Sequence, residues 1–416
     1  MNHFHFKDGE MHAEGVPLER IRATFGSPTF VYSDAALVEA VTAFARPFAR
    51  APLVCYAVKA NSNIAILNRL AGIGCGFDIV SGGELTRVLR AGGDPRKTVF
   101  SGVGKTRDEI RQALNADILC FNVESASELR AVTQVAAEVG SRAPISIRVN
   151  PDVDAGTHPY IATGLRETKF GVTPDVALEL YDAASREPAL EVVGIDCHIG
   201  SQILSVEPFA EALTRLLPII DELERRDIHL QHLDLGGGIG VTYKNETPVA
   251  TDEYASALTQ TLGARDLPLI FEPGRYIAAN AGVLVTEVLY LKVAEAGNFA
   301  IIDAAMNDLI RPALYDAWQA VHNLHQGSGP ERIYDLVGPV CETGDFIARG
   351  RKLRLTEGDG LAIMSAGAYG MAMSSNYNSR NRAAEVLVRG DDFHLIRERE
   401  TIDDQLRGER LAPPVT

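Results

Sequence analysis

Eight short apolar runs, each followed by polar or glycine-rich residues, alternate with helical segments from residue 53 onward. The segments between them include residues 124–140, where serines able to cap a helix precede an apolar repeat of about 3.6 residues. Eight strands alternating with helices predict a (β/α)8 barrel, although the pattern alone also allows a doubly wound sheet. The eight runs occupy residues 53–60, 74–81, 97–104, 117–125, 145–151, 192–201, 232–238 and 268–275.

The pattern changes after about residue 280, where strands joined by short turns replace the alternation. This change predicts an antiparallel β domain, and residues 27–33 can supply one of its strands. We therefore expect an N-terminal segment, 1–34, that contributes to the β domain, a barrel over 35–280 and a β domain over 281–416. The strand-like segments of this last part are residues 281–304, 332–353, 360–370 and 383–397.

Composition and charge narrow the classes of partner. The chain has 416 residues, is 46% hydrophobic and 23% charged, and carries a formal net charge of −15 without a run of lysine and arginine. Nucleic acid and anionic membranes are therefore poor candidate partners. The five cysteines show no C-x-x-C spacing, and four lie in apolar strand-like segments, which predicts reduced, buried thiols. The sequence has no signal-peptide pattern and no run of about 18 apolar residues, so we expect a cytoplasmic protein without membrane contact.

Residues suited to chemistry follow the predicted strands. The active sites of (β/α)8 barrels form at the carboxyl ends of the strands, so these residues are expected to share one rim. They are Lys59, Asp78, His198, Ser201, Gly236, Gly237, Gly238 and Glu272.

Lys59 directly follows the apolar run of residues 53–58, which is predicted to be a buried strand. A charged ammonium at such a place costs several kcal/mol, to order of magnitude, unless it is paired or neutralised. One interpretation is a lysine whose amine extends to solvent. The other is an amine that burial makes nucleophilic and able to form a Schiff base.

The neighbouring motifs also have two interpretations each. The glycines in residues 233–240 suit a phosphate or form a flexible turn, and they do not follow the G-x-G-x-x-G pattern of dinucleotide sites. Glu272 either pairs with Arg275 within its turn or faces a protonated pyridine nitrogen. His198 is either structural or stacks on an aromatic ring, and Ser201 can hold a phosphate. Together these parts are typical of a pyridoxal 5′-phosphate site, with Lys59 holding the cofactor as an imine.

Nine segments, in order along residues 27–390, resemble the motifs of the diaminopimelate decarboxylase family, which belongs to the alanine-racemase-fold group of pyridoxal phosphate enzymes. Each segment alone is a weak signal, whereas nine in the same order are a strong one. The segments are YAVKANSN, FDIVSGGEL, HPYIATGLRETKFG, CHIGSQ, LDLGGGIG, EPGR, CETGD, GAYG and NYNSR.

The resemblance implies a role for each matching residue. Lys59 corresponds to the Schiff-base lysine, His198 to the histidine that stacks on the ring, and Cys341 to a proton donor, and no metal is implied. The implied cofactor contacts are Lys59, Asp78, His198, Ser201, Gly237, Gly238, Glu272, Gly274, Arg275 and Tyr369. The implied substrate contacts are Arg275, Arg311, Tyr315, Glu342 and Tyr369. In the family Cys341 and Glu342 reach the site from a second subunit, which implies a homodimer with shared active sites.

The resemblance implies decarboxylation of meso-diaminopimelate to L-lysine and CO2. A carboxylate such as Glu272 beside the ring nitrogen favours decarboxylation, whereas a racemase of similar fold has an arginine there. Decarboxylases of ornithine, arginine or carboxynorspermidine share most cofactor motifs and stay as alternatives. So does a non-catalytic regulator of the same fold, although such a regulator would lack the lysine. Residues 158–171 and 311–317 favour diaminopimelate.

Overall fold

The computed structural model describes residues 3–154, 168–295, 297–327 and 329–413. The chain divides into two compact units. One unit, which we call the β unit, comprises Met1–Ala36 and Ala278–Thr416, and the other, the barrel unit, comprises Leu37–Ile277.

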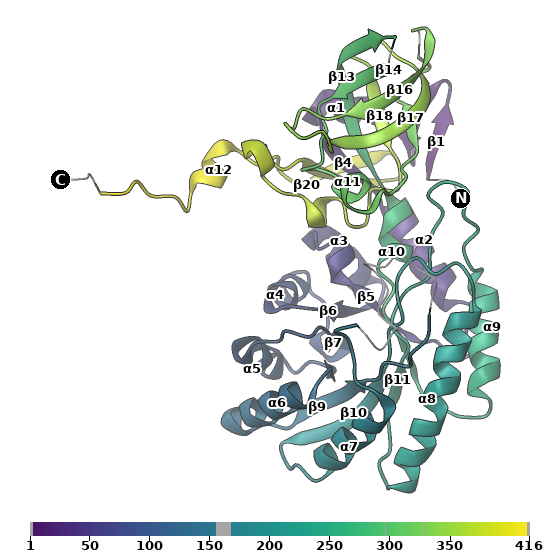
Figure 1. Cartoon of the computed structure of the whole chain (residues 1–416), viewed down its shortest axis with the longest axis vertical. Coiled ribbons are helices and arrows are strands. Elements are labelled where there is room, and N and C mark those ends of the chain that lie inside the picture. Colours follow the sequence, from purple (N-terminus) through teal and green to yellow (C-terminus); the bar gives the residue numbers. More distant parts are fainter. Residues whose placement is uncertain (1–2, 155–167, 296, 328, 414–416) are drawn as a thin grey trace. The chain divides into compact units, whose positions relative to one another are not determined.

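Eight parallel strands form a closed barrel in the barrel unit (Figure 1), because the last strand pairs with the first. Each strand contains or overlaps one of the eight apolar runs, so the predicted fold class is confirmed and the doubly wound sheet is excluded. The strands are β5 (Leu53–Ala57), β6 (Gly76–Ile79), β7 (Thr98–Phe100), β8 (Cys120–Val123), β9 (Ala143–Arg148), β10 (Leu190–Asp196), β11 (His232–Asp234) and β12 (Leu269–Phe271).

Helices follow the barrel strands. The predicted helix is α6 (Ala126–Val139), in which the hydroxyl of Ser125 accepts a hydrogen bond from the backbone N–H of Glu128 at 3.1 Å. No helix within the described ranges is long and apolar enough to cross a membrane. The other helices are α2 (Asp34–Ala45), α3 (Ile64–Gly72), α4 (Gly82–Arg90), α5 (Arg107–Ala116), α7 (Pro174–Ser185), α8 (Glu207–Arg225), α9 (Thr251–Leu262) and α10 (Arg275–Ala278).

Lys59 lies just beyond its strand. The strand β5 ends at Ala57, and Lys59 is in a short 3-10 turn, η1 (Val58–Ala60). Four cysteines are buried free thiols, as predicted, and Cys341 is exposed.

The β unit is built on one large sheet with the order β17-β16-β14-β13-β4-β19-β20. Residues 27–33 supply β4 (Thr29–Ser33), as expected, and it lies between β13 (Gly282–Ala294) and β19 (Ala384–Arg389). The sheet is mostly antiparallel, but β4 pairs in parallel with β19, and β14 (Gly297–Ile302) does so with β16 (Glu331–Val337). Tight hairpins join only antiparallel neighbours, and each of these two pairs is connected by a long stretch of chain.

The remaining elements complete the β unit. Its other strands are β1 (Phe4–Lys7), β2 (Glu10–Ala13), β3 (Val16–Pro17), β15 (Val321–Asn323), β17 (Phe346–Arg354), β18 (Gly360–Ile363) and β20 (Asp392–Arg397). Its helices are α1 (Leu18–Phe25), α11 (Arg311–Tyr315) and α12 (Ile402–Leu406), and its 3-10 turns are η3 (Ala279–Ala281), η4 (Met371–Met373) and η5 (Tyr377–Ser379). Its core includes Ile21, Val31, Val283, Ala362 and Val386, which come from both ends of the chain.

Candidate active site

The amine of Lys59 is paired with a buried carboxylate. Its Nζ donates to Oδ2 of Asp78, on β6, at 2.6 Å. The side chain of Asp78 is fully buried, whereas that of Lys59 is 40% exposed. The side chain is therefore partly exposed, as the first interpretation of Lys59 expects, while its amine is paired as a buried charge would need.

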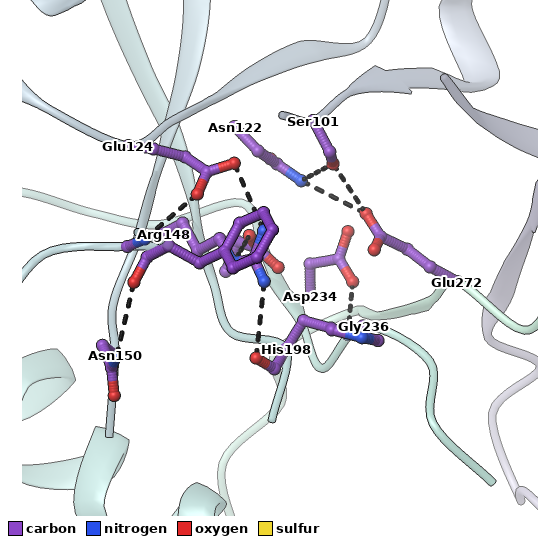
Figure 2. A network of polar contacts seen from close by, with 12 residues as sticks. Ser101, Asn122, Glu124, Arg148, Asn150, His198, Asp234, Gly236 and Glu272 are labelled. Carbon is purple, nitrogen blue, oxygen red and sulfur yellow. Dashed lines mark hydrogen bonds and ion pairs between the residues drawn. The ribbon is translucent and has the colours of Figure 1, made fainter. Parts of the chain in front are cut away.

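Glu272 follows β12 and is held by two neutral donors, as Figure 2 shows. Its Oε1 accepts from the hydroxyl of Ser101 at 3.2 Å and from the amide nitrogen of Asn122 at 3.3 Å. Arg275 donates to Ser201 and Tyr243, and the interpretation that Glu272 faces a ring nitrogen stays a prediction.

Buried carboxylates surround Glu272. Oxygens of Asp196, Asp234 and Glu272 all lie within 4.8 Å of one another. Burial, and then the charge of Asp234, raises the pKa of Glu272 well above its usual value. Burial likewise raises the pKa of Asp234 to about 7. Oδ1 of Asp78, Oδ1 of Asp196 and Oδ2 of Asp234 have no hydrogen-bond partner among the described residues.

Arg148, at the end of β9, is the cation of this network. Its guanidinium lies 3.2 Å from Oε1 of Glu124 and 3.9 Å from Oδ2 of Asp196, and it donates to the carbonyl of His198 at 3.4 Å. Figure 2 shows Arg148 reaching from Glu124 to His198. This residue therefore links the ends of three strands, β8, β9 and β10.

His198 carries a neutral imidazole. Its Nδ1 accepts the backbone N–H of Gly237 at 3.1 Å, so any ring proton is on Nε2. Burial, and then the positive charges of Arg148 and Lys59, hold the pKa of His198 well below its usual value. The uncharged ring is thus fixed against the loop of residues 236–238, which we call the glycine loop.

The glycine loop packs closely against two neighbouring strand ends. A Cβ on Gly237 would lie 2.3 Å from the carbonyl oxygen of Glu272, and one on Gly238 would lie 2.7 Å from that of Gly200. Gly274 is less tight, since its Cβ would meet that of Ala57 at 3.0 Å. The close packing at Gly237 and Gly238 excludes larger residues, so a free flexible turn does not describe this loop.

Ser201 and Arg275 meet at the same rim. The hydroxyl of Ser201 accepts from Nε and Nη2 of Arg275 at 3.1 and 3.0 Å, and Nη1 donates to the hydroxyl of Tyr243 at 2.7 Å. A guanidinium beside a hydroxyl and a glycine loop is a suitable anion site.

The other predicted site residues lie in the β unit, in two groups. In the first group the guanidinium of Arg311 lies 5.6 Å from the ring centre of Tyr315 and 5.8 Å from that of Tyr369. Arg311 is buried, and Tyr369 has a left-handed backbone with φ of 56°. These three residues are suited to a carboxylate.

The second group is the exposed loop that contains Cys341 and Glu342. The backbone N–H of Cys341 donates to Oδ1 of Asn378 at 3.1 Å, and the hydroxyl of Tyr377 donates to Oε1 of Glu342 at 2.5 Å. The NYNSR segment therefore fixes the CETGD loop.

Sequence reasoning missed several residues of the barrel network. They are Ser101, Asn122, Glu124, Arg148, Asp196, Asp234 and Tyr243. All but Tyr243 lie in or beside a predicted strand run, so a systematic reading of every strand end would have found most of them. Of the segment 158–171, residues 158–167 lie outside the described residues.

Sequence comparisons identify related proteins over the full length of the chain. Residues 34–279 match the family model described as the pyridoxal binding domain of pyridoxal-dependent decarboxylases. The diaminopimelate decarboxylase of Pseudomonas aeruginosa is 58% identical over 99% of this chain and 100% of its own length.

Solved structures of diaminopimelate decarboxylases are also similar to this chain. The diaminopimelate decarboxylase of Helicobacter pylori in complex with L-lysine has a TM-score of 0.91 at 43% identity, covering 94% of this chain and 98% of its own. The enzyme of the same name from M. jannaschii has a TM-score of 0.93 at 36% identity, covering 99% and 98% of the two chains.

Proposed function

Because this chain belongs to the diaminopimelate decarboxylase family of pyridoxal-dependent decarboxylases, we propose that it converts meso-diaminopimelate to L-lysine and CO2, the last step of lysine biosynthesis. The observation that carries the proposal is that an amine and a buried carboxylate follow two neighbouring strands at the barrel rim. The amine of Lys59 follows β5, and the buried carboxylate of Glu272 follows the neighbouring strand β12.

The residues at the rim fit pyridoxal 5′-phosphate. Lys59 offers an accessible amine, and Glu272 a carboxylate already oriented through one oxygen. Asp78 and Asp234 each keep one oxygen without a hydrogen bond among the described residues, as expected of groups that face a bound ligand. In our proposal the phosphate lies at Ser201, Gly237, Gly238 and Arg275, with Asp78, His198, Gly274 and Tyr369 completing the contacts.

The cofactor, when bound, supplies an electron sink for the charge that the loss of CO2 leaves on the substrate. The task of Glu272 is to keep a proton on the ring nitrogen, which makes this sink stronger. Neutral His198 provides a flat face for the ring without adding a positive charge. The task of Asp78 is to hold the amine of Lys59 at the end of β5.

We propose that the β unit recognises the substrate. Arg311, Tyr315 and Tyr369 suit the carboxylates of a diamino diacid, and Glu342 suits its distal ammonium. In the barrel unit, Arg275 is a further proposed substrate contact. The thiol of Cys341 is proposed to return a proton to the α-carbon. Because Cys341 and Glu342 are exposed in one chain, we propose that they serve the site of a partner subunit in a homodimer.

Substrate chemistry separates this proposal from its rivals. Ornithine and arginine carry no distal carboxylate, so Arg311 and Tyr315 would have no corresponding group to bind. A regulator without catalysis would have no use for Lys59, Asp78 and Cys341 together. We further propose that the protein acts in the cytoplasm.

A substrate screen tests the function. Purified protein supplied with pyridoxal 5′-phosphate is assayed for CO2 release from meso-diaminopimelate, ornithine, arginine and lysine. We expect release from meso-diaminopimelate alone, with L-lysine as the product. Faster release from ornithine or arginine would replace the proposal with a rival decarboxylase, and no release from any substrate would favour the regulator.

A further inference from the structure

Two neutral side chains from neighbouring strands converge on a single oxygen of Glu272. Ser101 follows β7 and Asn122 lies in β8, and both are buried. Their hydrogen bonds to Oε1 of Glu272 measure 3.2 and 3.3 Å. Figure 2 shows both contacts on one side of the carboxylate, while its other oxygen lies on the side of Asp234.

The donors are themselves oriented. The amide nitrogen of Asn122 also donates to the hydroxyl of Ser101 at 3.1 Å, so the hydroxyl proton is directed at Glu272. The amide oxygen of Asn122 faces the thiol of Cys120 at 3.6 Å, which assigns the amide nitrogen to the side of Glu272. The three side chains form a closed arrangement in which each hydrogen bond fixes the next.

Burial and the surrounding charges act against the ionised form of Glu272. The carboxylates of Asp234, Asp78 and Asp196 oppose ionisation of Glu272, and the amine of Lys59 favours it. Hydrogen bonds donated to a carboxylate stabilise its charged form. Ser101 and Asn122 therefore favour an ionised, fixed Glu272 at a place where burial and like charges favour a neutral one.

We propose that Ser101 and Asn122 are positioning residues for decarboxylation, which hold Oε1 of Glu272 and so fix the carboxylate that would partner the ring nitrogen of the cofactor. This inference rests on the proposed function. Neither residue touches the substrate in this scheme, since both act through Glu272. In metal sites, removal of an outer partner that orients a ligand typically reduces function by about 10- to 100-fold, and we expect the same range here.

The test compares Ser101→Ala and Asn122→Ala with a matched control, Ser146→Ala. Ser146 is a fully buried serine of β9 whose hydroxyl has no hydrogen-bond partner among the described residues. For each variant we would measure kcat and KM for meso-diaminopimelate, the affinity of the cofactor-free protein for pyridoxal 5′-phosphate and the pH dependence of the absorbance of the bound cofactor.

We expect kcat to fall about 10-fold in Ser101→Ala and up to about 100-fold in Asn122→Ala, with KM changed less than about threefold. Cofactor affinity should fall, and the acid limb of the spectral titration should move to higher pH, because Glu272 loses donors that favour its charge. Ser146→Ala should stay within about twofold of the wild type, and Ser101→Thr, which keeps the hydroxyl, should restore most of the activity.

A double-mutant cycle decides whether the residues act through Glu272. In a Glu272→Gln background, Asn122→Ala should reduce kcat by much less than it does alone. The inference would be overturned if the losses in kcat of the two single variants simply multiply in the double variant. It would also be overturned if Ser101→Ala and Asn122→Ala keep the kcat and the spectral titration of the wild type. If Asn122→Ala does not fold, Ser101→Ala, Ser101→Thr and the double variant Ser101→Ala with Glu272→Gln decide whether the effect acts through Glu272.

The two proposals fail in different ways. A wild-type protein that binds the cofactor but releases no CO2 from meso-diaminopimelate overturns the proposed substrate, while cofactor affinity and the spectral titration still test Ser101 and Asn122. A wild-type protein that does not bind the cofactor overturns both.

Discussion

The Nζ atom of Lys59 lies 2.6 Å from Oδ2 of Asp78, a fully buried aspartate on the adjacent strand, while the lysine side chain keeps 40% of its surface exposed. The two residues contribute different properties to the pair. Asp78 fixes the direction of the amine, and the exposure of Lys59 leaves that amine accessible to an aldehyde.

Replacing Lys59 by alanine should abolish covalent attachment of the cofactor and reduce turnover by orders of magnitude, because the reacting amine is lost. Borohydride reduction and peptide mapping of the wild type should place the cofactor on Lys59. Lys105 is the natural internal control, since it is a buried lysine near the same rim, paired with Glu128 at 2.6 Å. A label on Lys105 would contradict the assignment.

The variant Glu272→Gln should still bind the cofactor but decarboxylate roughly 100-fold more slowly or worse, the scale of losing one preorganised electrostatic contact. Glutamine keeps the size of the side chain and can still accept from Ser101 and Asn122. Cofactor content by absorbance and kcat by CO2 release check the two halves of this expectation. Near-normal turnover would mean that another group controls the ring nitrogen.

Chains carrying Lys59→Ala and chains carrying Cys341→Ala should complement each other when mixed. In a mixed dimer with shared sites, one site has an intact lysine from one chain and an intact cysteine from the other. With random exchange about half of the dimers are mixed and each has one working site, so activity should recover to about a quarter of wild type. Differently tagged chains would verify exchange, and exchange without recovery would rule out a shared site that needs both residues.

Asp234→Asn should stabilise the cofactor-free protein more at pH 8 than at pH 5. The pKa of Asp234 is raised to about 7, so the stability linked to its neutral form is present in acid and is lost as the pH rises through that value. Asparagine stays neutral throughout. The gain in unfolding free energy should be larger at pH 8 by about 2–3 kcal/mol, measured by chemical denaturation.

The control for this experiment is Asp266→Asn, an exposed aspartate whose side chain is 90% accessible. Its effect on the unfolding free energy should be small, because the substitution is at an exposed surface position. An equal response of both variants to pH would show that Asp234 does not carry the raised pKa.

The sequence predicted the barrel well because every strand is an apolar run that ends in a chemically distinct residue. It also predicted β4, and it placed Lys59 and Glu272 beside strand ends. It missed Ser101, Asn122 and Arg148: their places in predicted strand runs make them candidates, but residue type alone does not reveal which of these side chains turn toward a common centre. The sequence left open whether the amine of Lys59 is exposed; the strand ends at Ala57, one residue before the end of the apolar run, and the lysine side chain is 40% exposed.

The parallel pairing of β4 with β19 was not predictable, because no local turn specifies it. It also determines how long β4 lacks this neighbour while the chain is being synthesised. The hydroxyl of Tyr32, on β4, donates to Glu385, on β19, across a sequence separation of 353 residues. At a ribosomal rate of about 5–20 residues per second, β4 is made about 20 to 70 s before that neighbour exists. Throughout that interval the edge of β4 that pairs with β19 has no native partner, and only in its last part, once β12 has been made, does the chain contain all eight barrel strands.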